Sequence, residues 1–422
     1  MATDTTTTFV DYLKDIYGTS VQNGIREDSP YYDLIKTADK TFLGGTGFKV
    51  PVRLGRGGNA GSVAEDGILP TAAVPTSDRI EVGPTELWAR FNLTKRLIQA
   101  AKGDKATFAD AFAERAEQTM MELQEQLNRQ LIGNKIATAG GHTTTVTGAL
   151  GRSTTASTTV VLTTDTAMQF RRGMKVLLGT GTEFLAGTGD ASVVTDITAK
   201  NTVVLSVAAA IDDIIAVGDS AVLATGWNSY GDELQGLAFA VDNADTFQTI
   251  NPADTGKAAW KATKDSAAVD RPLQKSHITG SYMAVKVKSG KHANCIVTHD
   301  LGLIEMQKLM ESDVRYVPQT FKGGFEHELF AWNNGKKNCP VVPESCVEVG
   351  SFYFLNLDDI RMGYIMDWGW LDDDGSKASR VLNRASFEHA YGCMFQQLFL
   401  ARNSHLLLRD IIVDDSSFAA PD

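Results

Sequence analysis

The sequence has few cysteines and no metal-binding spacing among them. Its four cysteines, Cys295, Cys339, Cys346 and Cys393, all fall in the last third of 422 residues. None forms the CxxC pairs typical of structural zinc sites, so we expect reduced, partly buried thiols. The seven histidines show no HxH or HExxH spacing. We therefore predict neither a metal ion nor a cofactor.

Long apolar runs and an excess of positive charge are also missing. No run of about eighteen apolar residues is present, and the N-terminus has no basic leader, so neither a membrane span nor a secretory signal is expected. The 40 lysines and arginines face 51 aspartates and glutamates, which gives a net charge of −11. Nonspecific DNA binding needs clustered cations. Any DNA would be a neighbour of this protein, which we expect to be made and kept in a cytosol.

The N-terminal segment has the pattern of a polar arm that carries a short helix. Phe9, Leu13 and Ile16 recur at helical spacing and are followed by Gly18. Such a helix has little to pack against on its own, so we predict that these three residues contact another subunit.

Residues 50–67, VPVRLGRGGNAGSVAEDG, lie between two extended runs at 46–53 and 79–98. A phosphate-binding loop would need a Lys-Ser or Lys-Thr and a helix after its last glycine, and both are missing. The pattern instead predicts a long hairpin. Because an isolated ribbon is only marginally stable in water, we expect another copy of the chain to support it. Its predicted inter-subunit contacts are Arg53, Arg56, Glu65, Asp66 and Arg79.

Residues 105–133 give the strongest helical pattern in the chain. Apolar side chains repeat at threes and fours, polar ones fill the opposite face, and Gly133 ends the run. The predicted core face of this spine helix consists of Phe108, Phe112, Met120, Leu123, Leu127 and Leu131.

Residues 143–226 are rich in Thr, Val, Gly and Ala and contain an internal similarity. TVVL occurs at 159–162 and 202–205, and RRGMKVLLGTG at 171–181 is echoed by AVGDSAVLATG at 216–226. We predict two related β-units inserted as a small barrel or sandwich, with chance similarity of strand sequences as the alternative.

A layered α/β pattern follows residue 227. It predicts a helix at 273–289, a buried strand at 294–298, and a further helix capped by Thr298. LDDDGS at 371–376 favours a hairpin turn over a calcium loop, and Asp358 and Asp359 favour a turn at a strand end. No GxSxG elbow is present. We expect that the protein is not an enzyme.

Three segments near the C-terminus resemble the major capsid proteins of tailed bacteriophages. They are SDVRYVPQTFKGGF at 312–325, SFYFLNLDDIRMGYIMDWGWLDDDG at 351–375 and ARNSHLLLRDI at 401–411. The resemblance implies the α+β tailed-phage major capsid fold. The implied parts are an N-terminal arm at 1–40, an extended β-hairpin loop at 41–100, a peripheral domain with the spine helix at 101–142, an inserted β-domain at 143–226, an axial domain at 227–360, and return strands to the peripheral domain together with the C-terminus at 361–422.

The same resemblance implies self-assembly into hexamers and pentamers of an icosahedral shell around double-stranded DNA, built in the host bacterial cytoplasm without a membrane. The N-terminus lacks the long prodomain of some members, so a separate scaffolding protein is expected, together with a portal and a possible decoration protein. Two other interpretations stay open: a tail-tube or adhesin-like β-protein, and a nucleotide- or sugar-processing enzyme.

Overall fold

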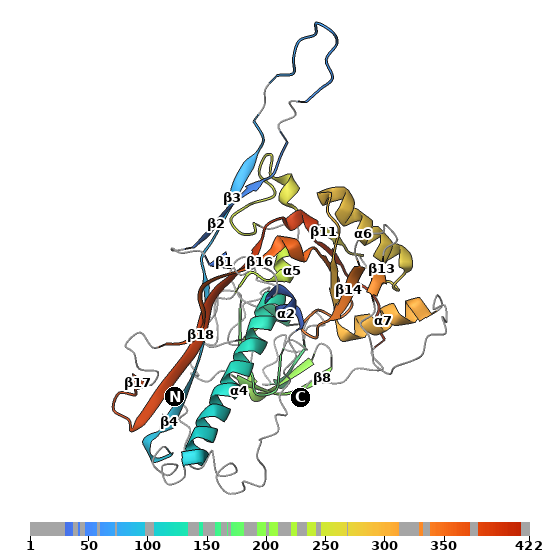
Figure 1. Ribbon diagram of the computed structural model, residues 1–422. Coiled ribbons are helices and arrows are strands. Elements are labelled where there is room, and N and C mark those ends of the chain that lie inside the picture. Colours follow the sequence, from blue (N-terminus) through green and yellow to red (C-terminus); the bar gives the residue numbers. More distant parts are fainter. Residues whose placement is uncertain are drawn as a thin grey trace, which may run out of the picture.

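The protein has an α+β fold with one long projection (Figure 1). The computed structural model describes residues 30–36, 41–42, 47–56, 60–71, 74–97, 105–133, 143–146, 157–161, 167, 170–180, 192–199, 202–209, 221–225, 234–241, 246–267, 269–311, 329–331, 338–371 and 379–414. Within these residues the strands form three larger sheets and a two-stranded ribbon. Phe9, Leu13 and Ile16 of the predicted arm lie outside the described residues.

Two long antiparallel strands dominate the first sheet, which we call the peripheral sheet. β16 (Ile360–Trp370) pairs with β18 (Ser386–Phe399), and β18 pairs along its other edge with β4 (Thr85–Thr94). The short strands β1 (Thr41–Phe42) and β17 (Ser379–Arg380) complete the sheet. The predicted turn at Asp374 and Gly375 lies outside the described residues.

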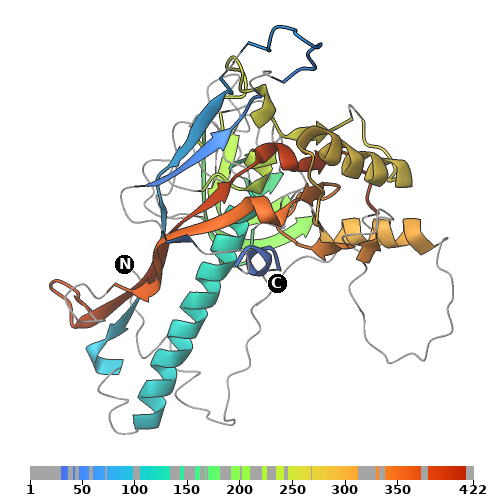
Figure 2. The same cartoon turned by 45° about the horizontal axis from the view of Figure 1, so that its top comes forward.

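The predicted spine helix is present as α4 (Lys105–Ile132), which runs beside β4 and β18 in both views (Figures 1 and 2). Leu123, Leu127 and Leu131 are buried, whereas Met120 is only half-buried. Phe108 and Phe112 lie in the helix, but their side chains are outside the described part of the structure. The buried leucines follow helical spacing, which explains why the sequence predicted this face.

The axial sheet has the strand order β11-β19-β15-β12-β14-β13. Its strands are β11 (Thr263–Asp265), β12 (Cys295–Thr298), β13 (Leu329–Ala331), β14 (Asn338–Pro343), β15 (Phe352–Leu355) and β19 (Leu406–Leu408). Helices α6 (Lys275–Ser289) and α7 (Asp300–Glu311) cover one face, onto which alternate strand residues such as Ile296 and Phe354 project. Cys295 and Leu355 project from the other face into the central core.

One expectation for this region was wrong. Thr298 does not cap α7, because the strand continues through it and its hydroxyl donates to the Ser351 carbonyl at 2.9 Å. His299 takes that place, and its Nδ1 accepts the Leu301 N–H at 3.1 Å. Within residues 361–422, β17 and β18 lie in the peripheral sheet with β16, whereas the C-terminal strand β19 pairs with β11 and β15 of the axial sheet.

The described strands of the inserted segment form one six-stranded sheet with the order β5-β10-β7-β8-β9-β6. Its strands are β5 (Thr143–Val146), β6 (Ser157–Val161), β7 (Lys175–Thr180), β8 (Ser192–Ala199), β9 (Thr202–Ala209) and β10 (Ala221–Thr225). The predicted internal repeat agrees with its pairing, because Thr159 pairs with Val204 and its counterpart Thr202 pairs with Val161. The register is therefore symmetric between the two units.

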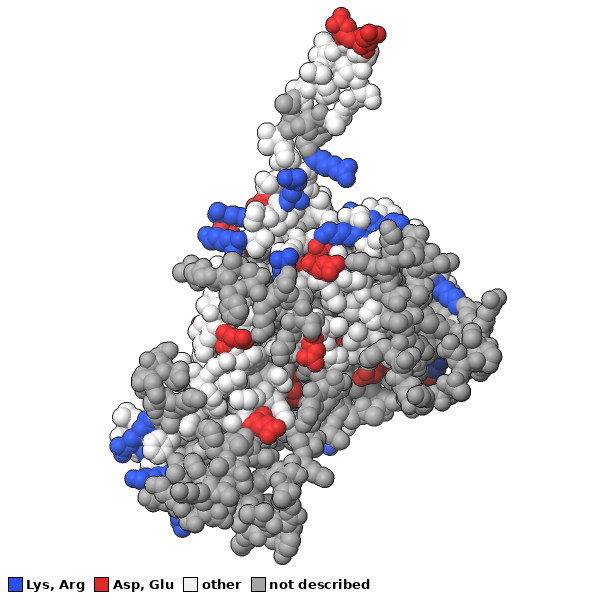
Figure 3. Space-filling view, in the orientation of Figure 1, with Lys and Arg blue, Asp and Glu red and all other residues white. Residues whose placement is uncertain are grey.

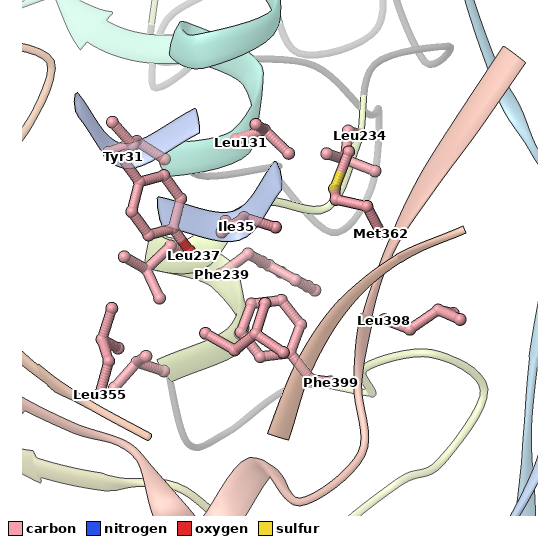
Figure 4. Packing of buried hydrophobic residues seen from close by; sticks show 14 of the residues in the cluster. Tyr31, Ile35, Leu131, Leu234, Leu237, Phe239, Leu355, Met362, Leu398 and Phe399 are labelled. Carbon is pink, nitrogen blue, oxygen red and sulfur yellow. The ribbon is translucent and has the colours of Figure 1, made fainter. Parts of the chain in front are cut away.

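The central core draws side chains from distant parts of the chain (Figure 4). Tyr31 and Ile35 of α2 (Pro30–Lys36) pack there with Leu131 of α4, Phe239 of α5 (Leu237–Val241) and Phe399 of β18. Three 3-10 turns complete the elements: η3 (Ala258–Trp260), η4 (Leu357–Asp359) and η5 (Arg402–Ser404). Residues 30–36 are thus part of the core, whereas the sequence placed them in an arm.

Candidate inter-subunit surface: the projecting hairpin

The projection begins as a two-stranded ribbon. β2 (Phe48–Arg53) pairs antiparallel with β3 (Ser77–Val82), in a register that places Phe48 opposite Val82 and Arg53 opposite Ser77. The second extended run was expected to continue to residue 98, but it divides after β3. Gly83 and Pro84 separate β3 from β4, which joins the peripheral sheet instead. Proline lacks a backbone N–H, so it favours such a change of partner strand.

The base of the hairpin is attached to its own subunit. Phe48 and Ile80 are fully buried in the central core. Lys257 Nζ lies 2.8 Å from an Asp78 carboxylate oxygen and 3.0 Å from one of Asp254. The hydrogen bond from Lys257 holds the pKa of Asp78 below its usual range. The expectation that the whole ribbon lacks support on its own body is therefore wrong for β2 and β3.

A tight turn at residues 247–250 adds a second attachment. Gln248 and Thr249 both have positive φ, 49° and 69°, which is uncommon for residues other than glycine. The Gln248 amide donates to the Gln397 carbonyl at 2.7 Å and accepts from the Phe399 N–H at 3.3 Å. Thr249 Oγ1 accepts the Glu81 N–H of β3 at 3.1 Å. The turn thereby connects β18 of the peripheral sheet to the hairpin.

Beyond these strands the hairpin stands clear of the body (Figures 1 and 3). The outermost backbone hydrogen bonds between its two described arms run from the Leu54 and Gly55 N–H groups to the Thr76 carbonyl, at 2.9 and 3.0 Å. Three large apolar side chains further out are almost fully in solvent: Ile68 is 97%, Leu69 78% and Val74 92% exposed. Large apolar side chains exposed to this extent on one projection are typical of an interaction site.

The end of the hairpin is a defined acidic turn. The Gly67 N–H donates to the Ala64 carbonyl at 2.9 Å, and Asp66 between them has a φ of 67°. Glu65 and Asp66 occupy its two central positions and are exposed. No helix follows in the described part of this loop, and carboxylates repel phosphate. Both observations disfavour the phosphate-loop interpretation.

The sequence-predicted contact residues divide between the outer hairpin and its base. Arg53, Arg56, Glu65, Asp66 and Arg79 are all exposed, and the Arg79 guanidinium also lies 2.6 Å from Glu81 of the same strand. Sequence reasoning missed the apolar residues Ile68, Leu69 and Val74, although the short runs GILP and AAVP in a polar loop carried that signal. It also missed Lys257, Gln248 and Thr249, which only the tertiary structure brings to the hairpin.

The described residues show little sign of reactive chemistry. They contain no cluster of three or more metal-ligating side chains. The four cysteines are buried and free, and burial raises the pKa of Cys339 and of Cys393 to about 12, which keeps these thiols protonated. Among the described helices, none is long and apolar enough to cross a membrane.

The comparison with solved structures identifies the fold. The protein of the "Cyanophage A-1(L) capsid asymmetric unit" aligns over 96% of this chain and 99% of its own, with a TM-score of 0.54 and 13% identity. The chain has the fold of tailed-phage major capsid proteins. Chains of the structures titled "Capsid of empty GTA particle computed with C5 symmetry" (TM-score 0.49, 12% identity, 97% of this chain and 99% of that one covered) and "Mycobacterium phage Bobi" (0.46, 9%, 98% and 100%) also align. No family model and no curated protein matches the sequence.

The capsid fold agrees with the fold class that residues 312–325, 351–375 and 401–411 predicted from sequence. At these identities the likeness is one of fold. The function of the projecting hairpin therefore follows from its own residues and contacts, not from the comparison.

Proposed function

We propose that this chain is the major capsid protein of a tailed bacteriophage. It assembles into the hexamers and pentamers of an icosahedral shell that encloses double-stranded DNA. A separate scaffolding protein, a portal and a decoration protein are its further proposed partners, and assembly takes place in the host bacterial cytoplasm.

The observation that carries this proposal is the exposed apolar segment between the acidic turn of the hairpin and β3. Ile68, Leu69 and Val74 lie on a projection whose base is fixed by Lys257 and by the turn at 247–250. Full burial of one such side chain stabilises a contact by roughly 1.5–3 kcal/mol. An apolar hairpin whose base is fixed to its own subunit is the device that a self-assembling subunit needs, since the fixed base already directs the projection away from the body and toward a neighbour.

The overall charge supports a lining role toward DNA. A net charge of −11 gives no general attraction to phosphates. Packaged DNA can therefore be a nonspecific neighbour that moves along the shell wall. On this proposal the chain itself is a structural protein and not an enzyme.

Electron microscopy of the expressed full-length chain tests the proposal. The chain is produced alone and together with the genes adjacent to its own, since these would include a scaffold. Closed shells, with nuclease-protected double-stranded DNA when the packaging genes are present, are the expected result. Open tubes, or only monomers under every condition, would overturn it.

Charge reversal supplies the matched variants. Arg56→Glu together with Arg79→Glu should strongly reduce the yield of shells, whereas Lys264→Glu on the axial sheet should not. If the yield of shells is the same for the double arginine variant and for Lys264→Glu, the hairpin is not the assembly contact. If instead Arg56→Glu and Arg79→Glu alter the binding of a nucleotide or sugar while the oligomer size stays normal, the enzyme interpretation is favoured.

A further inference from the structure

The outer hairpin carries its charges in a fixed order. Arg53 and Arg56 are exposed near the body, and Glu65 and Asp66 are exposed at the far end. Figure 3 shows acidic side chains at the end of the projection and basic ones where it joins the body. None of the four makes an ion pair with another described residue. The exposed apolar residues Ile68, Leu69 and Val74 occur between the acidic turn and β3.

This order of charges along one hairpin is complementary to the same order along a second hairpin that runs in the opposite direction. When two such hairpins lie side by side and antiparallel, the acidic turn of each lies against the basic residues of the other, and the apolar stretches meet between them. The spacing matches without adjustment, because the separation of acid and base is the same in both copies. A contact of this isologous kind forms about a two-fold axis. A parallel arrangement would oppose like charges, which is unfavourable.

The backbone also permits such a contact. Among the described residues 60–71 the one backbone hydrogen bond is that of the turn, from the Gly67 N–H to the Ala64 carbonyl. The other N–H and C=O groups of this segment are thus open to pairing with an incoming extended strand, as in β-strand addition.

We propose that the hairpins of two copies of this chain pair antiparallel about a local two-fold axis. The acidic turn of each copy, Glu65 and Asp66, binds Arg53 and Arg56 of the other. This inference rests on the proposed shell function and names the partner of the hairpin within it. Each hairpin contributes its acidic turn to one contact and its basic residues to the other, so two equivalent sets of contacts join each pair of copies.

Charge exchange within one chain tests the pairing. A base variant carries Arg53→Glu and Arg56→Glu. A tip variant carries Glu65→Arg and Asp66→Asn, since asparagine tolerates the positive φ of the turn. Each should lower the shell yield about tenfold or more, and the variant with all four changes should recover most of it. Recovery is expected only if the residues changed in the base variant contact those changed in the tip variant on the other copy. If the fourfold variant assembles no better than the base variant, the pairing is wrong.

Crosslinking gives an independent readout. Ala60 is exposed and lies midway between Arg56 and Glu65, close to the expected axis. Ala60→Cys should therefore form disulfide-linked dimers under mild oxidation, whereas Val269→Cys, at a site that is 79% exposed on the body, should not. The native cysteines are buried and do not compete.

The same crosslinking assay would also detect a contact between the acidic turn and another basic site on the neighbouring subunit. Lys95, Arg96 and Arg380 are exposed on the peripheral domain, near Leu382, which is 84% exposed. Efficient crosslinking of Glu65→Cys to Arg380→Cys, with none at Ala60→Cys, would overturn the proposal. If the unmodified chain forms no shell under any condition, the proposed function fails. Crosslinking of Ala60→Cys in the concentrated free chain still decides the pairing.

Discussion

Lys257 Nζ lies 2.8 Å from the carboxylate of Asp78, and this contact joins the segment before the axial sheet to strand β3 of the hairpin. Both side chains are about one quarter exposed, 26% and 27%. The ion pair acts together with the Thr249 hydroxyl, which accepts the Glu81 N–H of the same strand. The subunit therefore sets the direction of its own hairpin before any neighbour is met.

Breaking this ion pair should loosen the hairpin base. In Lys257→Ala, hydrogen exchange of the β2 and β3 amides should become faster in the free chain, because one of the two polar attachments is lost. Lys257→Arg, which keeps the positive charge between Asp78 and Asp254, should retain slow exchange, and Lys264→Ala should leave it unchanged. Because the pKa of Asp78 is lowered, the contact should be complete above about pH 4 and lost as the pH falls further. Equal exchange in all variants would show that the pair does not hold the hairpin.

Gly236 should tolerate no side chain. A Cβ there would lie 2.4 Å from the Gln130 carbonyl oxygen and 2.6 Å from that of Gly133. Gly236→Ala should destabilise the protein by roughly 1–3 kcal/mol in chemical denaturation, since backbone at the end of α4 must shift. Gly280→Ala on α6 meets nothing within 4 Å and should stabilise by up to about 1 kcal/mol. A similar effect of both substitutions would contradict the close approach.

Local patterns were sufficient to predict some elements. The spine helix, the strands of the hairpin base and the helix at 273–289 follow from periodicity and turn residues alone. The pairing of the inserted strands is consistent with the internal similarity, but the sequence did not predict its register.

Elements that depend on distant partners were missed. Tyr31 is buried because its hydroxyl accepts from Gln397 and its N–H donates to Glu344, both more than 300 residues away. β4 leaves the hairpin because β18 offers it a longer partner. The acidic and basic hairpin residues were predicted individually, but the fixed base that presents them required Lys257 and Gln248, whose sequence positions carry no signal for that role.

The buried face of α4 offers a graded test of packing. Leu127 is fully buried in the central core, whereas Met120 is half-buried. Leu127→Ala should lower the free energy of unfolding by about 2–5 kcal/mol, because it leaves a cavity. Met120→Ala should cost clearly less in the same denaturation experiment. A larger loss at Met120 would mean that the helix is rotated relative to the core.

His405 should make the stability depend on pH. It is fully buried, and burial lowers its pKa to about 4, while the nearby Asp359 and Lys291 act in opposite directions. The unfolded chain keeps the ordinary histidine pKa of about 6.5 and takes up a proton that the folded chain excludes. The contribution of His405 to the free energy of unfolding is complete above about pH 6.5 and falls by up to about 3 kcal/mol as the pH drops to about 4.

Unfolding of His405→Gln, measured across this window, should show a flatter pH dependence than that of the unmodified chain. His292→Gln, which removes a half-buried histidine bonded to Tyr282, is the matched control and should keep the slope. If both variants retain the full slope, another group is responsible for it.

The inserted sheet should be separable from the rest of the protein. The chain leaves α4 at Gly133 and returns at Gly236, and the two glycines are in direct contact. A short linker of about four flexible residues can therefore replace residues 134–233. We expect the shortened chain to fold, to lose the hydrogen bond from Arg171 to Ser345 at 3.0 Å, and still to form closed shells.

The contrasting variant replaces residues 60–71 with two glycines and should fold but not assemble, because it removes Glu65, Asp66, Ile68 and Leu69. Electron microscopy and sedimentation distinguish the two results. Shells from the first variant and monomers from the second would place assembly in the hairpin. Multimers formed by residues 134–233 alone, with none from the shortened chain, would favour the tail-tube or adhesin interpretation, since the β-sheet itself would then be the assembling part.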